Sequence, residues 1–347
     1  MKSSMRPFLF IVVLLGLPIS GFAIASAETM VSAPRTITVA LDGSGEFSSI
    51  QEAVDSARKG DSVLIKTGSY AQDLTIHSKE KIKIIGEGTD KVLLMGRKEM
   101  VGVLHVGKWP YGATDIEISG LTINEHGGHA LGIFNGHRIT LRNVHVKGMV
   151  FGQQVQDVRI EDCVIGGSET TGIHFSDSQA ILVGNLIHDN DYGVNVTGRS
   201  SVRLEHNIIT RNLFEALVIS DQAKAVLINN TLVKNGGGAA FLGSSENEVS
   251  GNIFGFNKIG LLIAPSSQTT TSYNVLFNGE ADYMRAGSPN VQAPELKVET
   301  DMRADPRFVD SEHDDFRLRS DTTLVDRGGF RYLGALPPVH LPASIHQ

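Results

Sequence analysis

The chain has 347 residues, a formal net charge of −7 and one cysteine. Its acidic balance disfavours nucleic acid and anionic membrane surfaces as partners. The lone Cys163 excludes an internal disulfide framework, and we expect it to behave as a small buried hydrophobic residue.

Residues 1–27 have the three-part pattern of a secretory signal peptide. Two basic residues, Lys2 and Arg6, precede an apolar run at 8–17, and Ala-Ser-Ala at 25–27 fits the small-x-small cleavage rule. The apolar run is shorter than the ~20 residues needed to span a bilayer. We therefore expect cleavage after residue 27, export to the periplasm or the extracellular space, and no membrane span in the mature chain.

Residues 28–61 are predicted to form an N-terminal strand followed by a capping helix. The strand is expected at 36–41, and a short amphipathic helix at 48–57. Two capping boxes are possible at its start, Ser48 with Gln51 or Ser49 with Glu52. Such a helix would cover the open end of a stack of strands and protect its edge.

From about residue 116 the chain repeats with a period near 22 residues, and one Asn or Asp recurs in each repeat. The successive separations are 19, 23, 22, 23, 22 and 22 residues, for Asn143, Asp162, Asn185, Asn207, Asn230, Asn252 and Asn274. A period in this range indicates a solenoid whose rungs bury their apolar faces against one another. A second series follows four or five residues later, at Asn190, Asn212, Asn235, Asn257 and Asn278.

We interpret these Asn residues as structural. Each would occupy a tight bend, where Asn tolerates the left-handed backbone conformation, and its amide would bond to the Asn residues above and below. Each rung would contain three strands and three turns. The sequence thus predicts an all-β parallel β-helix over residues 62–300, followed by a C-terminal cap and tail over 301–347.

The repeat pattern x-N-x-I-x-x-N-x-x-G-I-x-L resembles the right-handed parallel β-helix superfamily of pectin-lyase type over roughly residues 36–330. This resemblance implies the fold and its handedness. The superfamily includes lyases, hydrolases, esterases, epimerases, adhesins and noncatalytic accessory proteins, so it implies no single activity. The stretches 41–54 and 66–70 also resemble the opening of pectin methylesterases, but the later catalytic Asp and Arg motifs of that family have no counterpart here.

Departures from regular turns indicate where chemistry could lie. Extra residues accumulate at 125–129 and 166–171, and the strand that follows the second of these turns has a polar outward position. If Ile173 and Phe175 point inward, His174 points outward, stacked in register with Asn195, Val218, Ala240 and Leu262. We therefore expect the functional site between residues 125 and 215.

Lyase action or epimerisation on a uronate polymer needs a base at C5 and a cation for the carboxylate. We predict His174 as the base, with Arg199 or Arg211 on the carboxylate. The predicted substrate-binding residues are His126, His129, Asn195 and Asp191.

Asp189 and Asp191 could alternatively hold calcium together with backbone oxygens, although Asx residues are also expected in a turn. No other cofactor is predicted. Hydrolysis would require two carboxylates, Asp189 with Asp191 or Glu169, and is less favoured.

Two functions remain open from the sequence. The first is an exported lyase or C5-epimerase that acts, as a monomer, on an acidic polysaccharide. The second is a noncatalytic carbohydrate-binding or periplasmic accessory β-helix. Against the first, few aromatic residues that could stack on sugars lie near the expected face: Trp109, Tyr111 and Tyr192.

Overall fold

The computed structural model describes residues 33–96, 102–287 and 289–339, except for the side chains of residues 126–128. The described residues from Pro34 onward belong to one compact unit. The predicted signal peptide and the last eight residues of the predicted tail lie outside the described residues. Within the described ranges, no helix is long and apolar enough to cross a membrane.

The N-terminal segment forms a strand and a short helix, as the sequence predicts. Strand β1 (Thr36–Val39) is followed by α1 (Ile50–Ser56), which packs against β1, β2 and β4. The hydroxyl of Ser49 accepts a hydrogen bond from the backbone N–H of Glu52, so the second of the two possible caps is the one used. The helix buries Ile50, Ala53 and Val54 against the first rungs.

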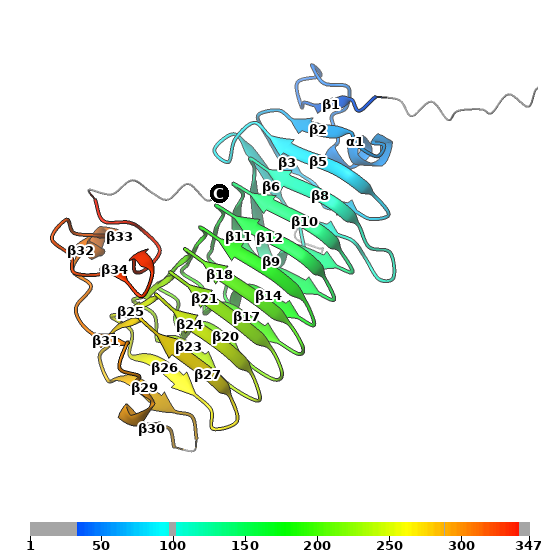
Figure 1. Ribbon diagram of the computed structural model, residues 1–347. Coiled ribbons are helices and arrows are strands. Elements are labelled where there is room, and N and C mark those ends of the chain that lie inside the picture. The colour runs from blue at the N-terminus through cyan, green and yellow to red at the C-terminus, as the bar shows by residue number, and fades with distance from the viewer. Residues whose placement is uncertain (1–32, 97–101, 288, 340–347) are drawn as a thin grey trace, which may run out of the picture. The chain divides into compact units, whose positions relative to one another are not determined.

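One strand of each rung joins an eleven-stranded sheet, sheet A, whose neighbouring strands are all parallel (Figure 1). Its strands after β1 are β2 (Ser62–Ile65), β5 (Glu80–Gly86), β8 (Thr114–Ser119), β10 (His137–Arg142), β12 (Gln156–Glu161), β15 (Gln179–Val183), β18 (Ser201–Glu205), β21 (Lys224–Ile228), β24 (Glu246–Ser250) and β27 (Gln268–Ser272).

Two more strands follow the sheet A strand in each rung, and they form two further parallel stacks. We call the stack of the first of these strands the first-strand stack and the other the second-strand stack. The first-strand stack contains β3 (Gly68–Ala71), β6 (Val92–Met95), β13 (Val164–Gly166), β16 (Leu186–His188), β19 (Ile208–Thr210), β22 (Thr231–Val233), β25 (Ile253–Gly255), β28 (Val275–Phe277) and β31 (Met302–Arg303). The second-strand stack contains β4 (Leu74–Ile76), β7 (Leu104–Val106), β14 (Thr171–Ser176), β17 (Tyr192–Thr197), β20 (Glu215–Ile219), β23 (Gly237–Phe241), β26 (Ile259–Ile263) and β29 (Ala281–Arg285), with β30 (Val291–Gln292) antiparallel to β29. Two long strands, β9 (Thr122–Phe134) and β11 (His145–Gln153), serve both stacks.

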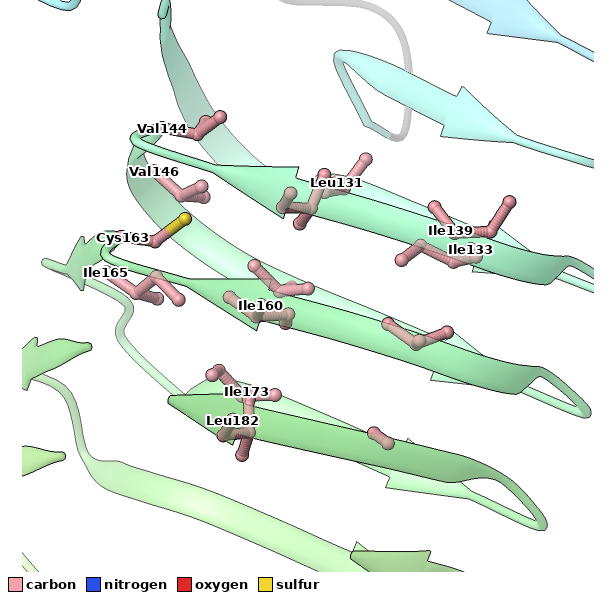
Figure 2. Close-up of a cluster of buried hydrophobic side chains, with 14 of the residues drawn as sticks. Leu131, Ile133, Ile139, Val144, Val146, Ile160, Cys163, Ile165, Ile173 and Leu182 are labelled. Carbon is pink, nitrogen blue, oxygen red and sulfur yellow. The ribbon is translucent and has the colours of Figure 1, made fainter. Parts of the chain in front are cut away.

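Alternate side chains of all three strands point into one continuous apolar core. Figure 2 shows part of it, with Leu131, Ile160 and Ile173 from different strands pointing inward. Cys163 lies among these side chains, 1% exposed, and burial raises the pKa of its thiol to about 12. This confirms the expectation of a buried, unreactive cysteine.

The predicted Asn ladder is present and is made of hydrogen bonds between rungs. Both the backbone N–H and the side-chain amide of Asn207, for example, donate to Oδ1 of Asn230, each at 2.9 Å. The same pair of bonds links successive members of the first series, from Asn185 to Asn274. The second series repeats the pattern from Asn190 to Asn278.

The backbone explanation for the ladder was wrong by one residue. The left-handed conformation belongs to the residue before the ladder Asn in both series, except at Asn278: His206, for example, precedes Asn207 with φ 54°. Asp162 is itself such a left-handed residue (φ 53°), and the ladder place in its rung is held by Cys163, whose N–H donates to Asn185. Two adjacent residues therefore share a bend: one takes the left-handed conformation, and the next holds the buried amide that bonds between rungs.

The predicted C-terminal cap lies along the side of the rungs. After η1 (Pro294–Leu296) and β31, the chain forms β32 (Phe308–Asp310), η2 (Ser311–His313), β33 (Asp315–Leu318), β34 (Val325–Arg327) and β35 (Phe330–Tyr332). Figure 1 shows these orange and red elements beside the rungs. Phe308, Phe316 and Leu318 pack on Val233, Ile253 and Val275. These outward residues of the first-strand stack are apolar and are therefore buried by a covering segment. We call residues 304–336 the C-terminal strap.

Candidate functional site

The outward side of the second-strand stack carries the predicted base. Ile173 and Phe175 are fully buried and His174 lies between them, half-buried and outward, as predicted. His174 pairs with Asn195, and the column continues through Val218, Ala240 and Leu262. The predicted register of this column is therefore confirmed.

In the other direction the same column continues through Phe151, Gly132 and His105. A Cβ at Gly132 would lie 2.6 Å from Cε2 of Phe134 and 2.9 Å from Cδ2 of His105. Glycine thus leaves room for two rings to lie over this strand.

Five rings form a contiguous surface here, which we call the His–Phe face. His129 stacks on Phe151 with ring centroids 5.0 Å apart, and His174 meets the edge of Phe151 at 5.3 Å. Phe134 joins this group at 5.8 Å from Phe151 and 5.9 Å from His105. The face therefore holds three histidines connected by two phenylalanines in contact with each other.

The histidines of the face are held in their neutral form. Burial lowers the pKa of His105, His129 and His174 below the usual 6.5, and His105 and His174 lower the pKa of His129 further. A neutral imidazole can accept a proton on one ring nitrogen and donate a hydrogen bond from the N–H of the other.

The hydrogen bonds around His174 indicate which ring nitrogen is free. Nε2 lies 3.3 Å from the hydroxyl oxygen of Thr197, and that hydroxyl donates to the carbonyl of Phe175. Nε2 is thus engaged by Thr197, and Nδ1 of His174 makes no hydrogen bond within the described residues. In the tautomer with the proton on Nε2, the lone pair lies on Nδ1.

Two buried polar atoms at this face have no hydrogen-bond partner within the described residues. They are Nδ1 of His129 and Oδ1 of Asn195, both predicted substrate-binding residues. A buried polar atom without a partner is costly unless a water or ligand satisfies it. Both atoms therefore lack the partner that a buried polar atom needs.

Neither predicted arginine contacts His174 within the described residues. Arg199 is exposed on the corner after β17, where it lines a cavity of about 500 Å³ together with Ser201, Lys224 and Gln268 of sheet A. Its backbone N–H donates to Asp177. The structure thus places Arg199 beside sheet A.

Arg211 joins the rungs to the C-terminal strap. Its guanidinium donates to both carboxylate oxygens of Asp189 at 3.0 Å and also to Asp314 of the strap. The hydrogen bond from Arg211 holds the pKa of Asp189 below its usual range, with a further contribution from His188.

The other predicted residues are dispersed. Asp191 is partly exposed on the corner before β17, two residues from Asp189, which is engaged by Arg211. No cluster of three or more His, Cys, Asp or Glu side chains suited to a metal occurs in the described ranges. The side chain of His126 lies outside the described residues.

Sequence reasoning missed His105, Phe134 and Phe151 as members of the site. The alternation of Leu104, His105 and Val106 in the sequence already indicates that His105 points outward from a strand. Extending the column toward the N-terminus from His174 would have reached both His105 and Phe151.

Exposed aromatic side chains lie at two corners adjoining the second-strand stack. Trp109 and Tyr111 are 74% and 58% exposed, in a turn that follows β7. Tyr192 stacks on Phe214 with centroids 5.0 Å apart at the corner before β20, and Phe214 is itself exposed.

The chain matches the family described as the right handed beta helix region, over residues 63–212 and 109–277, and belongs to that family. The predicted fold and the resemblance to the pectin-lyase-like superfamily are confirmed.

Two curated relatives match a short part of the chain. A pectinesterase/pectinesterase inhibitor of Ficus pumila var. awkeotsang is 34% identical over 70 residues, which are 19% of this chain and 13% of that protein. A pectinesterase of Petunia integrifolia is 36% identical over 74 residues, 20% of each chain. This chain therefore spans only about an eighth to a fifth of the length of these relatives.

Solved structures share the architecture over much more of the chain. Pectate lyase Pel9A superposes with a TM-score of 0.55 at 14% identity, covering 89% of this chain and 98% of the other. The A-module of the Azotobacter vinelandii mannuronan C-5 epimerase AlgE6 gives 0.57 at 16% identity, covering 67% and 73%. At these identities the likeness concerns the fold.

Proposed function

We propose that this protein is an exported polysaccharide-active enzyme that removes the C5 proton of a uronate residue, as a lyase or an epimerase, with His174 as the base. The observation that carries the proposal is the His–Phe face, where a neutral histidine presents an unprotonated nitrogen beside two unsatisfied polar atoms. The names of the similar proteins, among them a pectate lyase and a mannuronan C-5 epimerase, support a polysaccharide as the partner.

The chemistry requires one proton transfer followed by one of two outcomes. Nδ1 of His174 takes the proton from C5, and the electron pair left behind delocalises into the C6 carboxyl group. In a lyase this pair then forms the C4–C5 double bond while the C4–O bond breaks, and the leaving oxygen takes a proton. In an epimerase a proton returns to C5 from the opposite side of the sugar ring.

The neighbours of His174 support this role. The amide of Asn195, one rung away, can donate to the developing negative charge, and Nδ1 of His129 can hydrogen-bond a sugar hydroxyl. Arg199 and Arg211 stay predictions for the carboxylate, as does calcium. Asp191 and His126 stay predicted substrate contacts.

The dimensions of the face suit a polymer. The five strands from β7 to β17 stack at ~4.8 Å per step, so the column from His105 to Asn195 extends ~19 Å along the stack. A chain of several sugars can lie along such a surface.

The test is solvent exchange at C5. Purified protein is incubated with a panel of acidic polysaccharides in deuterated buffer, with and without calcium, and exchange at C5, unsaturated product and reducing ends are followed. We expect exchange or unsaturated product with at least one polymer, lost in His174→Ala.

The matched control is His137→Ala, which removes a partly exposed histidine from β10 of sheet A. That variant should keep full activity. Absence of exchange and of cleavage across the panel would contradict the enzymatic proposal, and equal activity of His174→Ala and the parent would contradict the role of His174 as the base.

A second candidate function is noncatalytic carbohydrate binding. It is favoured by one observation, that the guanidinium of Arg211 is held by Asp189 and Asp314 while Arg199 lies beside sheet A. Saturable glycan binding without C5 exchange or cleavage would support this function over the first.

A further inference from the structure

We propose that the hairpin at residues 108–111 is a sugar-stacking subsite, in which Trp109 and Tyr111 hold the same glycan where it leaves the His–Phe face. This inference rests on the proposed polysaccharide partner. It adds a binding element outside the second-strand stack and does not depend on catalysis.

The hairpin is fixed directly beside the face. It begins at Gly107, two residues after His105, and is closed by a hydrogen bond from the N–H of Lys108 to the carbonyl of Tyr111 at 2.7 Å. At its base, a Cβ on Gly107 would lie 2.0 Å from the carbonyl oxygen of Phe134. The hairpin is therefore seated against the end of the strand that carries a ring of the face.

The second glycine of the hairpin base is equally constrained. A Cβ on Gly112 would lie 2.0 Å from the carbonyl oxygen of Asn135, the residue after Phe134. Both ends of the hairpin thus approach the neighbouring rung more closely than any other residue type allows.

The side chains at the tip are not used for packing. Trp109 is 74% exposed and Tyr111 is 58% exposed, although each offers a large apolar ring with a polar tip. Exposed rings of this kind bind the apolar faces of sugar rings. Lys108 is also exposed and makes no ion pair within the described residues, so its ammonium is available to a uronate carboxylate.

Geometry sets a minimum length for the ligand. From β7, which leads into the hairpin, to β14, which carries His174, there are three strand steps, or ~14 Å. A chain that reaches both places must exceed this span. The contribution of Trp109 should therefore appear with long oligosaccharides and be absent with the shortest ones.

The sequence supplies a direct probe, because Trp109 is the one tryptophan of the chain. Intrinsic tryptophan fluorescence thus reports on this hairpin alone. Size-fractionated oligosaccharides of uronate polymers are titrated into the protein, and fluorescence is compared with calorimetric binding on the same samples.

We expect a saturable fluorescence change whose midpoint equals the calorimetric Kd. Trp109→Ala should raise the Kd for long oligosaccharides about tenfold and leave kcat within about twofold, while the Kd for the shortest ligands stays unchanged. The matched control is Leu41→Ala, which removes another exposed apolar side chain, 53% exposed, from the turn after β1. It should change neither quantity.

The outcomes separate the two proposals. Calorimetric binding or turnover with no tryptophan response, and with an unchanged Kd in Trp109→Ala, overturns the hairpin subsite and leaves the proposed function intact. A tryptophan response without C5 exchange or cleavage supports the subsite and overturns the enzymatic function. Absence of binding, exchange and cleavage with every ligand overturns both.

Discussion

The side-chain amide of Asn274 donates to Oδ1 of Asp301 at 3.0 Å, and the backbone N–H of Asn274 donates to the same oxygen at 2.7 Å. The Asn ladder therefore ends on a carboxylate. Every Asn in the series both donates to the next rung and accepts from the previous one, so a last Asn would leave the amide hydrogen directed at the next rung without a partner. Aspartate only accepts, and it ends the series without an orphan donor.

The second ladder ends in the same way. The backbone N–H and the amide of Asn278 donate to Oδ1 of Asp282, at 3.1 and 3.0 Å. In the first ladder the remaining oxygen of Asp301 accepts from the hydroxyl of Tyr283 at 2.5 Å, which satisfies a carboxylate that is 1% exposed. A buried charge is tolerated here because all its neighbours are donors.

Removing this terminal acceptor should destabilise the last rungs. Asp301→Ala leaves both donors of Asn274 and the Tyr283 hydroxyl without a partner, and we expect a loss of about 2–4 kcal/mol in the free energy of unfolding. Asp301→Asn keeps one acceptor oxygen and should lose about half as much. Urea denaturation of the three proteins measures the difference, and equal midpoints for Asp301→Ala and the parent would contradict this account of the ladder.

Alanine substitutions at two glycines separate the energetic cost of disturbing the hairpin packing from the cost of backbone strain. Gly107 and Gly167 both have positive φ, 80° and 74°, but a Cβ at Gly107 meets the Phe134 carbonyl whereas nothing lies within 4 Å of one at Gly167. Gly167→Ala should cost ~1–2 kcal/mol from conformation alone. Gly107→Ala should cost more and should also shift the fluorescence of Trp109, as measured by thermal unfolding and emission spectra. Equal costs would show that the hairpin is not seated as described.

Arg211 provides a test between a catalytic and a structural role. If Arg211 is structural, with its guanidinium held by Asp189 and Asp314, Arg211→Ala should leave C5 exchange unchanged and loosen the C-terminal strap. The ion pairs are partly exposed, so the loss in stability should stay below ~1 kcal/mol. Hydrogen–deuterium exchange over β32 and β33 should rise.

The comparison variant for Arg211 is Arg199→Ala, which alters no contact of the strap and should leave that exchange rate unchanged. Loss of C5 exchange in Arg211→Ala, with an unaltered strap, would instead restore the predicted role of Arg211 on the substrate carboxylate.

The histidines of the His–Phe face predict a pH dependence of stability. Their pKa values are lowered in the folded protein, so the unfolded chain binds more protons as the pH falls below the unfolded value of 6.5. Their contribution is complete above pH 6.5 and is lost as the pH falls through the lowered folded values. The melting temperature should decline over this window, and the slope should be shallower in a His105→Gln, His129→Gln double variant. An unchanged slope would contradict burial as the cause.

The lowered pKa of His174 also predicts how the proposed activity depends on pH. His174 must be neutral to accept a proton, and its lowered pKa keeps it neutral at pH 7. The rate of C5 exchange should therefore be constant above pH 6.5 and fall on the acid side, with an apparent pKa below 6.5. A rate that rises on acidification would identify a different catalytic group.

Local regularity made much of the fold predictable. The spacing of Asn207, Asn230 and Asn252 gave the rung length, and alternation around His174 gave its outward direction and its partners in the column. Even so, spacing could not distinguish the left-handed residue from the ladder residue beside it, since both recur with the same period. Asp162 was placed in the ladder for that reason.

The sequence by itself determined the solenoid, its core and the outward position of His174, because a repeat of fixed length stacks each residue on its equivalent and needs no other information. Only the tertiary structure decided what surrounds that histidine. The ring of Phe151 contacts it from β11 and Phe134 joins the face through Phe151, while the strap reaches Arg211 from residue 314, more than 100 positions away. Contacts of this kind depend on how side chains fill the surface between rungs, and no period in the sequence records them.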